Sequence, residues 1–292
     1  MPANTIEVTC DLCGSLNRKL VTIEYDYPIY KCSECTFVYV GKRPEAEDGR
    51  VVGEYYEEDR AEVEANRERY TGVIAFLLDE AAKLKKPGKI LDVGCGFGFF
   101  LLEARARGWE PYGTELSEAA VEIAKTQNGL ENVVYADLEN ADFGGVKFDV
   151  INLTNVLEHV PSPTAVLAAC KSFLAHGGIL LIRVPNMEFN DLKQSLLPIL
   201  RPMKIVPGGG ETCYLASPPP FHLAGFSNRT IRRYFEKTGL RTLAVKPSKL
   251  SGMANEKTAY MLFEKAVDAI FRLSFTKINL SPTILAIASN AK

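Results

Sequence analysis

The pattern of apolar and polar positions alternates between two periods from residue 70 onward. Short apolar runs of strand length recur, and the stretches between them place apolar residues three and four positions apart, which is helical spacing. The predicted strands lie at residues 89–93, 110–115, 133–135, 148–153, 179–184, 243–246 and 283–288. The predicted helices lie at residues 70–86, 99–107, 117–128, 163–174, 227–237 and 256–273. Strands that alternate with helices predict an α/β domain over residues 70–292, with a parallel sheet covered by helices on both faces.

The alternation is interrupted at about residues 186–226. This stretch is rich in Pro, Gly and Leu and contains the runs 207–210 (Pro-Gly-Gly-Gly) and 218–220 (Pro-Pro-Pro). A connection of this length inside a compact domain is usually functional, so we expect a lid over a site. On either side of it the helix starts are well marked, because Ser117 and Ser227 are favourable N-cap residues.

The first 43 residues contain two Cys-x-x-Cys pairs among short predicted strands. The four cysteines are Cys10, Cys13, Cys32 and Cys35. Each pair can place two thiolates on one side of a tight turn, and two such turns complete a tetrahedral zinc site with no open position. We therefore expect a structural zinc ribbon over residues 1–43. Residues 44–69 are rich in acidic side chains and are predicted to be a linker that leads into the first helix.

The composition is that of an ordinary globular protein. Of the 292 residues, 47% are hydrophobic and 24% are charged, and the formal net charge of -2 gives no attraction to nucleic acid or to an anionic membrane. We expect no signal peptide and no membrane span, because the apolar run at residues 178–182 stops at Arg183. The expected location is the cytoplasm, where thiols stay reduced and paired cysteines are more often metal ligands than disulfides.

A glycine-rich turn joins the strand at residues 89–93 to the next helix. Its glycines are Gly94, Gly96 and Gly98. Glycines let the backbone turn sharply and approach a ligand, and the following helix presents its positive end to the same point. Position 99 is Phe, where a dinucleotide fingerprint requires a small residue. Glu115 ends the second strand, where a carboxylate can accept both ribose hydroxyls, and Asp137 follows the third strand. These strand ends predict a pocket for a nucleoside without a phosphate.

Six segments in this order resemble the motifs of class I S-adenosylmethionine-dependent methyltransferases, of the methyltransferase domain family 23/11-like type. They are residues 91–98, 113–117, 136–138, 148–160, 174–178 and 183–186. The resemblance covers about residues 55–290 and is strongest over residues 88–185. It implies a Rossmann-like seven-stranded sheet with an antiparallel last strand and helices on both faces, in addition to the small N-terminal zinc ribbon.

The same resemblance implies S-adenosyl-L-methionine as the cofactor and assigns the residues that bind it. They are Asp92, Gly94, Gly96, Gly98, Glu115, Leu116, Asp137, Leu138, Leu153, Asn155 and Tyr56. Gly94 and Gly96 would pack beside the methionine part, Glu115 would hold the ribose and Asp137 the adenine. The end of the fourth strand, residues 153–155, would line the point of methyl transfer.

Methyl transfer to oxygen or carbon requires a group that accepts the acceptor's proton. His176 lies in a Gly-Gly turn and is expected at the surface, whereas His159 follows the fourth strand and His222 precedes the helix after the predicted lid. We expect His159 or His222 to be the general base, with Glu158 as support; a structural hydrogen-bonding role is the alternative. Some related O-methyltransferases bind a divalent metal through a Glu-x-x-Glu-His pattern. Asn155 replaces its first Glu here, so no catalytic metal is predicted.

The balanced charge, the apolar lid and the resemblance to sugar-modifying relatives favour a small-molecule or sugar acceptor, methylated on oxygen or carbon. An RNA methyltransferase that uses the ribbon for substrate contact is an alternative. The cations of residues 1–43 are balanced by acids, however, and residues 44–69 would repel phosphates, so a nucleic-acid partner is not expected. A non-catalytic zinc-ribbon adaptor is a further alternative, against which the intact glycine loop and Glu115 count.

Overall fold

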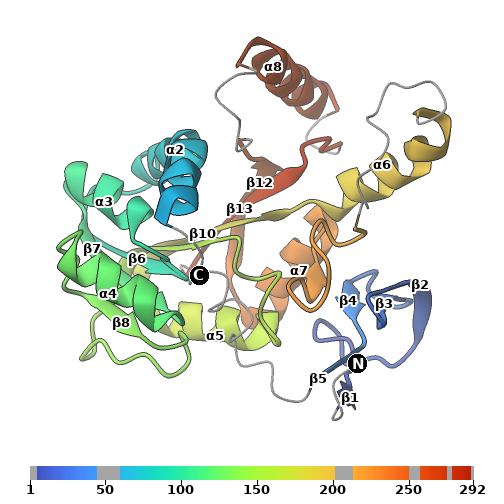
Figure 1. Cartoon of the computed structure of the whole chain (residues 1–292), viewed down its shortest axis with the longest axis horizontal. Coiled ribbons are helices and arrows are strands. Elements are labelled where there is room, and N and C mark those ends of the chain that lie inside the picture. The colour runs from blue at the N-terminus through green and yellow to red at the C-terminus, as the bar shows by residue number, and fades with distance from the viewer. Residues whose placement is uncertain (1–4, 45–59, 201–212, 250–256, 275–277, 291–292) are drawn as a thin grey trace.

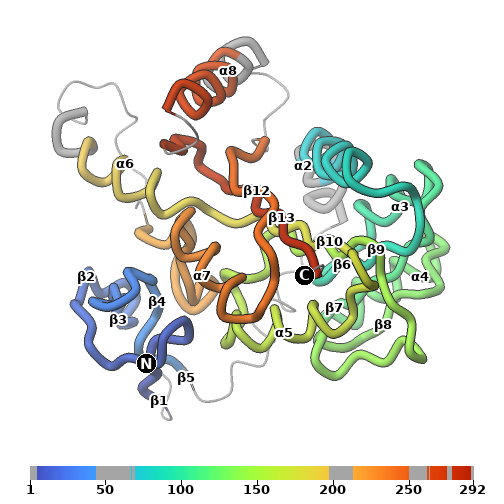
Figure 2. Tube along the Cα trace, turned by 180° about the vertical axis from the view of Figure 1, so that it is seen from behind, coloured from blue at the N-terminus to red at the C-terminus, as the bar shows by residue number. Residues whose placement is uncertain are grey.

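The structure is a computed structural model of the chain, and it describes residues 5–44, 60–200, 213–249, 257–274 and 278–290. Its strands form a seven-stranded sheet, a four-stranded sheet and a two-stranded sheet. Helices lie along the seven-stranded sheet, and the small sheets lie together beside α7 (Asn228–Thr238) (Figure 1, Figure 2). No helix within these described residues is both long enough and apolar enough to cross a bilayer.

The seven-stranded sheet has the order β12-β13-β10-β9-β6-β7-β8. Its strands are β6 (Lys89–Val93), β7 (Glu110–Glu115), β8 (Val133–Tyr135), β9 (Phe148–Thr154), β10 (Leu174–Pro185), β12 (Arg241–Pro247) and β13 (Thr283–Ser289). Pairing is parallel from β10 to β8, whereas β13 runs antiparallel to both β10 and β12. The sheet, its helices and its antiparallel last strand confirm the fold predicted from the sequence.

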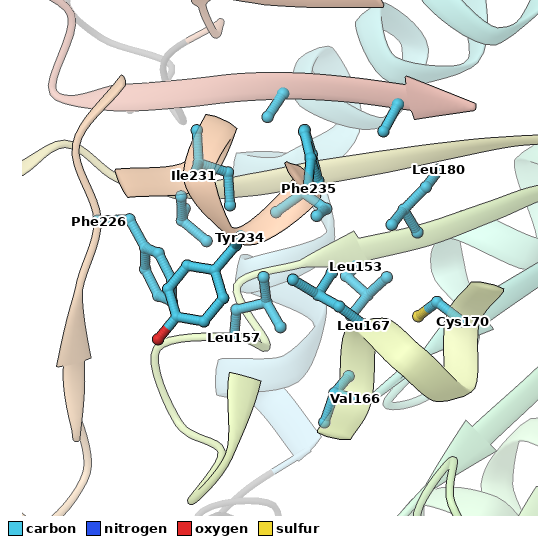
Figure 3. Close-up of a cluster of buried hydrophobic side chains, with 14 of the residues drawn as sticks. Leu153, Leu157, Val166, Leu167, Cys170, Leu180, Phe226, Ile231, Tyr234 and Phe235 are labelled. Atoms are coloured by element: carbon cyan, nitrogen blue, oxygen red, sulfur yellow. The ribbon is translucent and has the colours of Figure 1, made fainter. Parts of the chain in front are cut away.

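The strands of this sheet are buried on both faces, as a parallel sheet requires. Successive residues therefore enter opposite cores: Ile90 packs in one hydrophobic cluster and Leu91 in the other, and Leu181 and Ile182 of β10 divide in the same way. Figure 3 shows part of the core that contains Leu91 and Ile182. This two-sided burial explains why the strands read as nearly continuous apolar runs.

Six helices of the described chain lie next to the sheet, and a serine side chain caps the start of three of them. The six helices are α2 (Arg60–Ala82), α3 (Phe99–Ala106), α4 (Glu118–Thr126), α5 (Pro163–Phe173), α7 (Asn228–Thr238) and α8 (Lys257–Leu273). The Ser117 side chain accepts a hydrogen bond from Ala120 N at 3.2 Å, and the Ser227 side chain accepts one from Thr230 N at 3.1 Å. Both predicted N-caps are confirmed.

The N-terminal region folds into two small antiparallel sheets. β1 (Thr5–Glu7) pairs with β5 (Lys42–Pro44), and β2 (Arg18–Glu24), β3 (Tyr27–Cys32) and β4 (Val38–Val40) pair in succession. The fourth strand of this second sheet comes from far along the chain: β11 (Ala224–Gly225) pairs with β4. The sheet of the N-terminal region is therefore completed by a strand that comes from beyond the predicted domain boundary near residue 43.

The stretch at residues 186–226, expected to be one irregular connection, contains a helix. α6 (Met187–Leu200) occupies its first third, and residues 201–212 lie outside the described part of the chain. Asn186 starts the helix, because its side-chain oxygen accepts a hydrogen bond from Glu188 N at 3.0 Å, and Glu188 adds an acidic side chain in the first turn. The many Pro and Gly residues in the second half of the stretch favoured an irregular connection, so the helix in its first third was not predicted.

Candidate functional site

The glycine loop lies between β6 and α3, at the carboxyl edge of the sheet. Gly94 has φ +68° and Gly98 has φ +81°, both in the left-handed region that favours glycine. A Cβ atom at Gly98 would lie 2.2 Å from Leu130 Cδ1. Any other residue there would be both strained and in collision, so the loop conformation requires this glycine.

Glu115, at the end of β7, is fixed against this loop. One carboxylate oxygen accepts a hydrogen bond from Gly96 N at 2.8 Å, and the other accepts from Leu116 N at 2.7 Å and Ser117 N at 3.0 Å. Burial raises the pKa of Glu115, and the backbone N–H groups oppose that rise by stabilising the charged form. The side chain is only 4% exposed. The sequence-predicted ribose-binding residue and the glycine loop are thus joined in one rigid edge.

A buried polar pair lies beneath this edge. Asn152 of β9 donates to the Asp92 carboxylate of β6 at 2.7 Å, and Thr154 Oγ1 donates to the Asn152 side-chain oxygen at 3.1 Å. Burial raises the pKa of Asp92 to about 7; the Asn152 hydrogen bond lowers it and the charge of Glu115 raises it. Sequence reasoning selected Asp92 but not Asn152, because a polar residue inside an apolar strand has no partner that the sequence reveals.

The other predicted cofactor residues lie at different depths. Asp137 is partly exposed after β8 and accepts hydrogen bonds from Asn140 N and Nδ2, both at 2.8 Å, and Leu116 is also partly exposed. The side chains of Leu138 and Leu153 are buried in the hydrophobic core, so only their backbone can face a ligand at this edge. Tyr56 lies outside the described residues. Their assignment to cofactor binding stays a prediction.

A second constellation follows β9, which is the neighbour of β6 in the sheet. Glu158, His159 and His222 each offer a ligand atom within 4.8 Å of the others. The loop that carries Glu158 and His159 adjoins the glycine loop, since a Cβ atom at Gly94 would lie 3.1 Å from Val156 Cγ2. The structure therefore brings the three predicted catalytic residues together, next to the predicted cofactor edge. His176, by contrast, is exposed.

The tautomers of the two histidines follow from their backbone partners. His159 Nδ1 lies 2.7 Å from Phe221 O, and His222 Nδ1 lies 2.6 Å from Leu215 O. A carbonyl oxygen can only accept, so each Nδ1 carries the proton and each Nε2 keeps a free lone pair. The ring centroids are 4.7 Å apart. Both imidazoles therefore offer Nε2 as a base or a metal ligand.

Burial sets the protonation of this cluster. It lowers the pKa of His159 to about 4, helped by the nearby His222, and it lowers the pKa of His222 too. Burial raises the pKa of Glu158 to about 8, although the charge of Arg183 opposes the rise. Neither carboxyl oxygen of Glu158 has a hydrogen-bond partner among the described residues. At neutral pH both histidines are thus neutral, and Glu158 is mainly in its protonated, uncharged form.

Asn155, predicted to line the transfer point, is fixed by a residue of β10, and its role at the cofactor stays a prediction. It has φ +55°, and its side-chain oxygen accepts a hydrogen bond from Arg183 Nη1 at 2.8 Å. The Glu-x-x-Glu-His spacing involves only residues that are close together in the sequence. The fold adds the distant His222 to Glu158 and His159 as a third potential metal ligand, which that spacing cannot reveal.

The four N-terminal cysteines converge in a separate cluster. Their sulfur atoms all lie within 4.8 Å of one another, with Cys10 Sγ 3.3 Å from Cys35 Sγ and Cys13 Sγ 3.5 Å from Cys32 Sγ. Four thiolates bound to one tetrahedral zinc ion are about 3.8 Å apart, so this donor set fits that metal. Burial raises the pKa of Cys35 to about 11 and also raises that of Cys10, and a divalent cation is the counter-charge that such buried thiolates need.

The strand order, the antiparallel last strand and the glycine–carboxylate edge define a class I methyltransferase type of α/β domain. Comparison with known proteins agrees, because residues 63–245 match the family model described as "Methyltransferase domain". The chain belongs to this family of S-adenosylmethionine-dependent methyltransferase domains.

Two curated relatives are ubiquinone biosynthesis O-methyltransferases. The one from Hahella chejuensis is 33% identical over 139 residues, which are 45% of this chain and 57% of that enzyme. The one from Aromatoleum aromaticum is 29% identical over 159 residues, 53% of this chain and 64% of that enzyme. The chain thus spans less than two thirds of the length of these relatives.

Solved structures share the fold at low identity. The plantazolicin methyltransferase BpumL, in complex with a substrate analogue and SAH, is 18% identical with a TM-score of 0.50, covering 85% of this chain and 92% of that chain. The plantazolicin methyltransferase BamL, in a similar complex, is 16% identical with a TM-score of 0.51, covering 84% of this chain and 92% of that chain.

Proposed function

We propose that this chain transfers the methyl group of S-adenosylmethionine to a small-molecule or sugar acceptor, on oxygen or carbon. The observation that carries the proposal is the juxtaposition of two sites at one sheet edge. The glycine loop with Glu115 suits an adenosine-bearing ligand, and the neutral His159–His222 pair stands next to it. The curated relatives named above, which are O-methyltransferases, favour a small acceptor over RNA.

The chemistry is an in-line displacement, in which the residues of the chain position the acceptor and remove its proton. Bound S-adenosylmethionine would supply the methyl group: the acceptor oxygen or carbon would bond to the methyl carbon, the methyl–sulfur bond would break with its electron pair left on sulfur, and S-adenosylhomocysteine would leave. The proton of the acceptor goes to a free Nε2 of His159 or His222, whose Nδ1 protons are already bound to backbone carbonyls. Glu158 lies within 4.8 Å of the imidazolium that would result, and this new positive charge favours the ionised form of the Glu158 carboxyl group, which in turn stabilises the imidazolium.

We further propose that the four-cysteine cluster holds a structural zinc ion. The Sγ distances and the absence of disulfides among the seven cysteines of the chain support it. All four thiolates would be occupied by the metal, which leaves no open position for catalysis.

The test is methyl transfer from labelled S-adenosylmethionine to three pools of acceptors: sugar nucleotides, phenolic small molecules and RNA. We expect label in one of the first two pools, together with release of S-adenosylhomocysteine. His159→Ala and His222→Ala should lower turnover about 100-fold or more while cofactor binding is kept, and His176→Ala serves as the exposed control. Label in RNA alone would overturn the acceptor class, and failure to bind the cofactor would favour a non-catalytic adaptor.

A further inference from the structure

The cysteine cluster and the histidine pair are linked by two short chains of contacts. One chain leads from the first Cys-x-x-Cys turn to the segment of His159, and the other from the second turn to the segment of His222. Both histidine segments therefore lie against the N-terminal sheets, which sit beside α7 in both views of the molecule (Figure 1, Figure 2).

The first chain begins at Asp11, between Cys10 and Cys13. Its carboxylate accepts hydrogen bonds from Ser162 Oγ at 2.7 Å, from Thr164 N at 2.9 Å and from Thr164 Oγ1 at 2.6 Å. Ser162 is the N-cap of α5, and the loop that it closes carries His159 three residues earlier. An aspartate at a helix N-terminus is favourable in itself, and here it comes from a different part of the chain.

The same loop has a second anchor on the N-terminal region. Arg43 Nη2 donates a hydrogen bond to Pro161 O at 3.0 Å. Asp11 is itself held by α7, because its backbone oxygen accepts a hydrogen bond from Lys237 Nζ at 2.5 Å. The start of α5 and the residue before its cap are thus bonded to Asp11 and Arg43, neither of which belongs to the seven-stranded sheet.

The second chain begins just after Cys35. The Phe37 ring packs on Phe226 and Tyr234, with centroid distances of 5.6 and 5.2 Å, and Figure 3 shows the last two side by side. β4 then pairs with β11, and Val40 N donates to Leu223 O at 2.9 Å. Leu223 directly follows His222, so the backbone of the catalytic candidate is fixed by the sheet of the cysteine module.

The two chains meet at one carbonyl group. Glu158 O accepts from Leu223 N at 2.7 Å and from Ala224 N at 3.2 Å, and His159 Nδ1 donates to Phe221 O. The segment at residues 221–225 is therefore held between β4 on one side and the loop of Glu158 and His159 on the other. A change in the spacing of the two cysteine turns would move these two surfaces relative to each other.

We propose that the four-cysteine metal centre acts as a clamp that positions the His159–His222 pair, with Asp11 as a positioning residue. One ion joins the two turns, and each turn anchors one histidine segment. This inference rests on the proposed function for the importance of the pair in turnover, but the mechanical coupling can be measured without turnover. The chain has only three histidines, so the exposed His176 is an internal control.

The experiment uses full-length protein with ¹⁵N-labelled histidine and follows the imidazole signals by NMR. The perturbations are Asp11→Ala, in the zinc-loaded protein, and removal of the metal by a chelator. Glu34→Ala is the matched control, because Glu34 is an exposed acid in the second turn whose side chain contacts Asn17 within the same module. Binding of S-adenosylhomocysteine is measured on every sample.

We expect Asp11→Ala to shift or broaden the His159 signals, chelation to affect both His159 and His222, and His176 to stay unchanged throughout. Because a displacement of about 1 Å can lower a rate 100-fold, kcat should fall about 10- to 100-fold in Asp11→Ala, with the affinity for S-adenosylhomocysteine within about twofold of wild type. Glu34→Ala should match wild type in every measurement.

Unchanged His159 signals in Asp11→Ala would overturn the proposal, even if the metal-free protein unfolds. Absence of methyl transfer with altered histidine signals would instead leave the clamp in place and refute the proposed function. The two failures are thus distinguishable.

Discussion

Glu115→Gln is the substitution that tests the cofactor edge most selectively. The amide has the size of the carboxylate, but it offers one acceptor oxygen in place of two. In the structure three backbone N–H groups point at the two carboxylate oxygens, those of Gly96, Leu116 and Ser117. Whichever way the amide turns, its N–H₂ group faces at least one N–H donor, and a ribose hydroxyl loses a charged acceptor.

The magnitude follows from these contacts. A hydrogen bond to a charged group contributes about 1.5–3 kcal/mol, so loss of one or two toward the ribose should cost about 3 kcal/mol of binding. That free energy corresponds to a rise of about 100-fold in the Kd of S-adenosylhomocysteine. Calorimetric titration measures it, with Glu118→Gln on the exposed side of α4 as the matched control. A Kd of Glu115→Gln within about twofold of wild type would refute the assignment of the ribose to Glu115.

Three further predictions concern protonation and metal. Burial lowers the pKa of His159 to about 4, so kcat/KM should stay level between about pH 5 and 7, the range in which an ordinary histidine titrates. A break in the pH profile near about pH 6.5 would contradict a buried neutral base. Burial raises the pKa of Glu158 from 4.5 to about 8, so this carboxyl group ionises at a lower pH in the unfolded chain than in the folded one. The free energy of unfolding of the wild type should therefore fall as pH rises from about 4.5 to about 8. Denaturant titrations at about pH 5 and 8 should show a smaller fall for Glu158→Gln than for wild type, with the remainder due to the buried Asp92. An equal fall in the free energy of unfolding for the two proteins would argue against a buried acid at Glu158. Metal analysis should find one zinc ion per chain and much less in Cys13→Ser, whereas equal zinc contents would show that this thiol is not a ligand.

The sheet and its carboxyl edge were predictable because they depend on local pattern. Apolar runs of strand length, separated by helical spacing, define the order of elements, and parallel pairing brings the ends of β6, β7 and β9 to one edge. Gly94 and Glu115 could be chosen for the same reason, since Gly94 directly follows β6 and Glu115 is the last residue of β7. The burial of the Leu138 and Leu153 side chains could not be predicted, because the position of a residue near a strand end does not reveal whether its side chain points into the core or toward a ligand.

The contacts that join distant segments were not predictable from one sequence. β11 is two residues long and pairs with a strand more than 180 positions earlier, so no local periodicity marks it. Asp11 reads as an ordinary turn residue within a cysteine knuckle until the fold places α5 against it. Asn152 and Arg183 are polar residues inside buried strands, whose partners only the tertiary structure supplies.

The most direct measurement is a calorimetric titration of the purified wild-type chain with S-adenosylhomocysteine, followed by a crystal structure of the complex. We predict one binding site per chain, with the sugar hydroxyls on the carboxylate of Glu115 and the sulfur facing the two buried imidazoles. No detectable binding at millimolar ligand, or an adenosine seated away from the carboxyl ends of β6 and β7, would contradict the account.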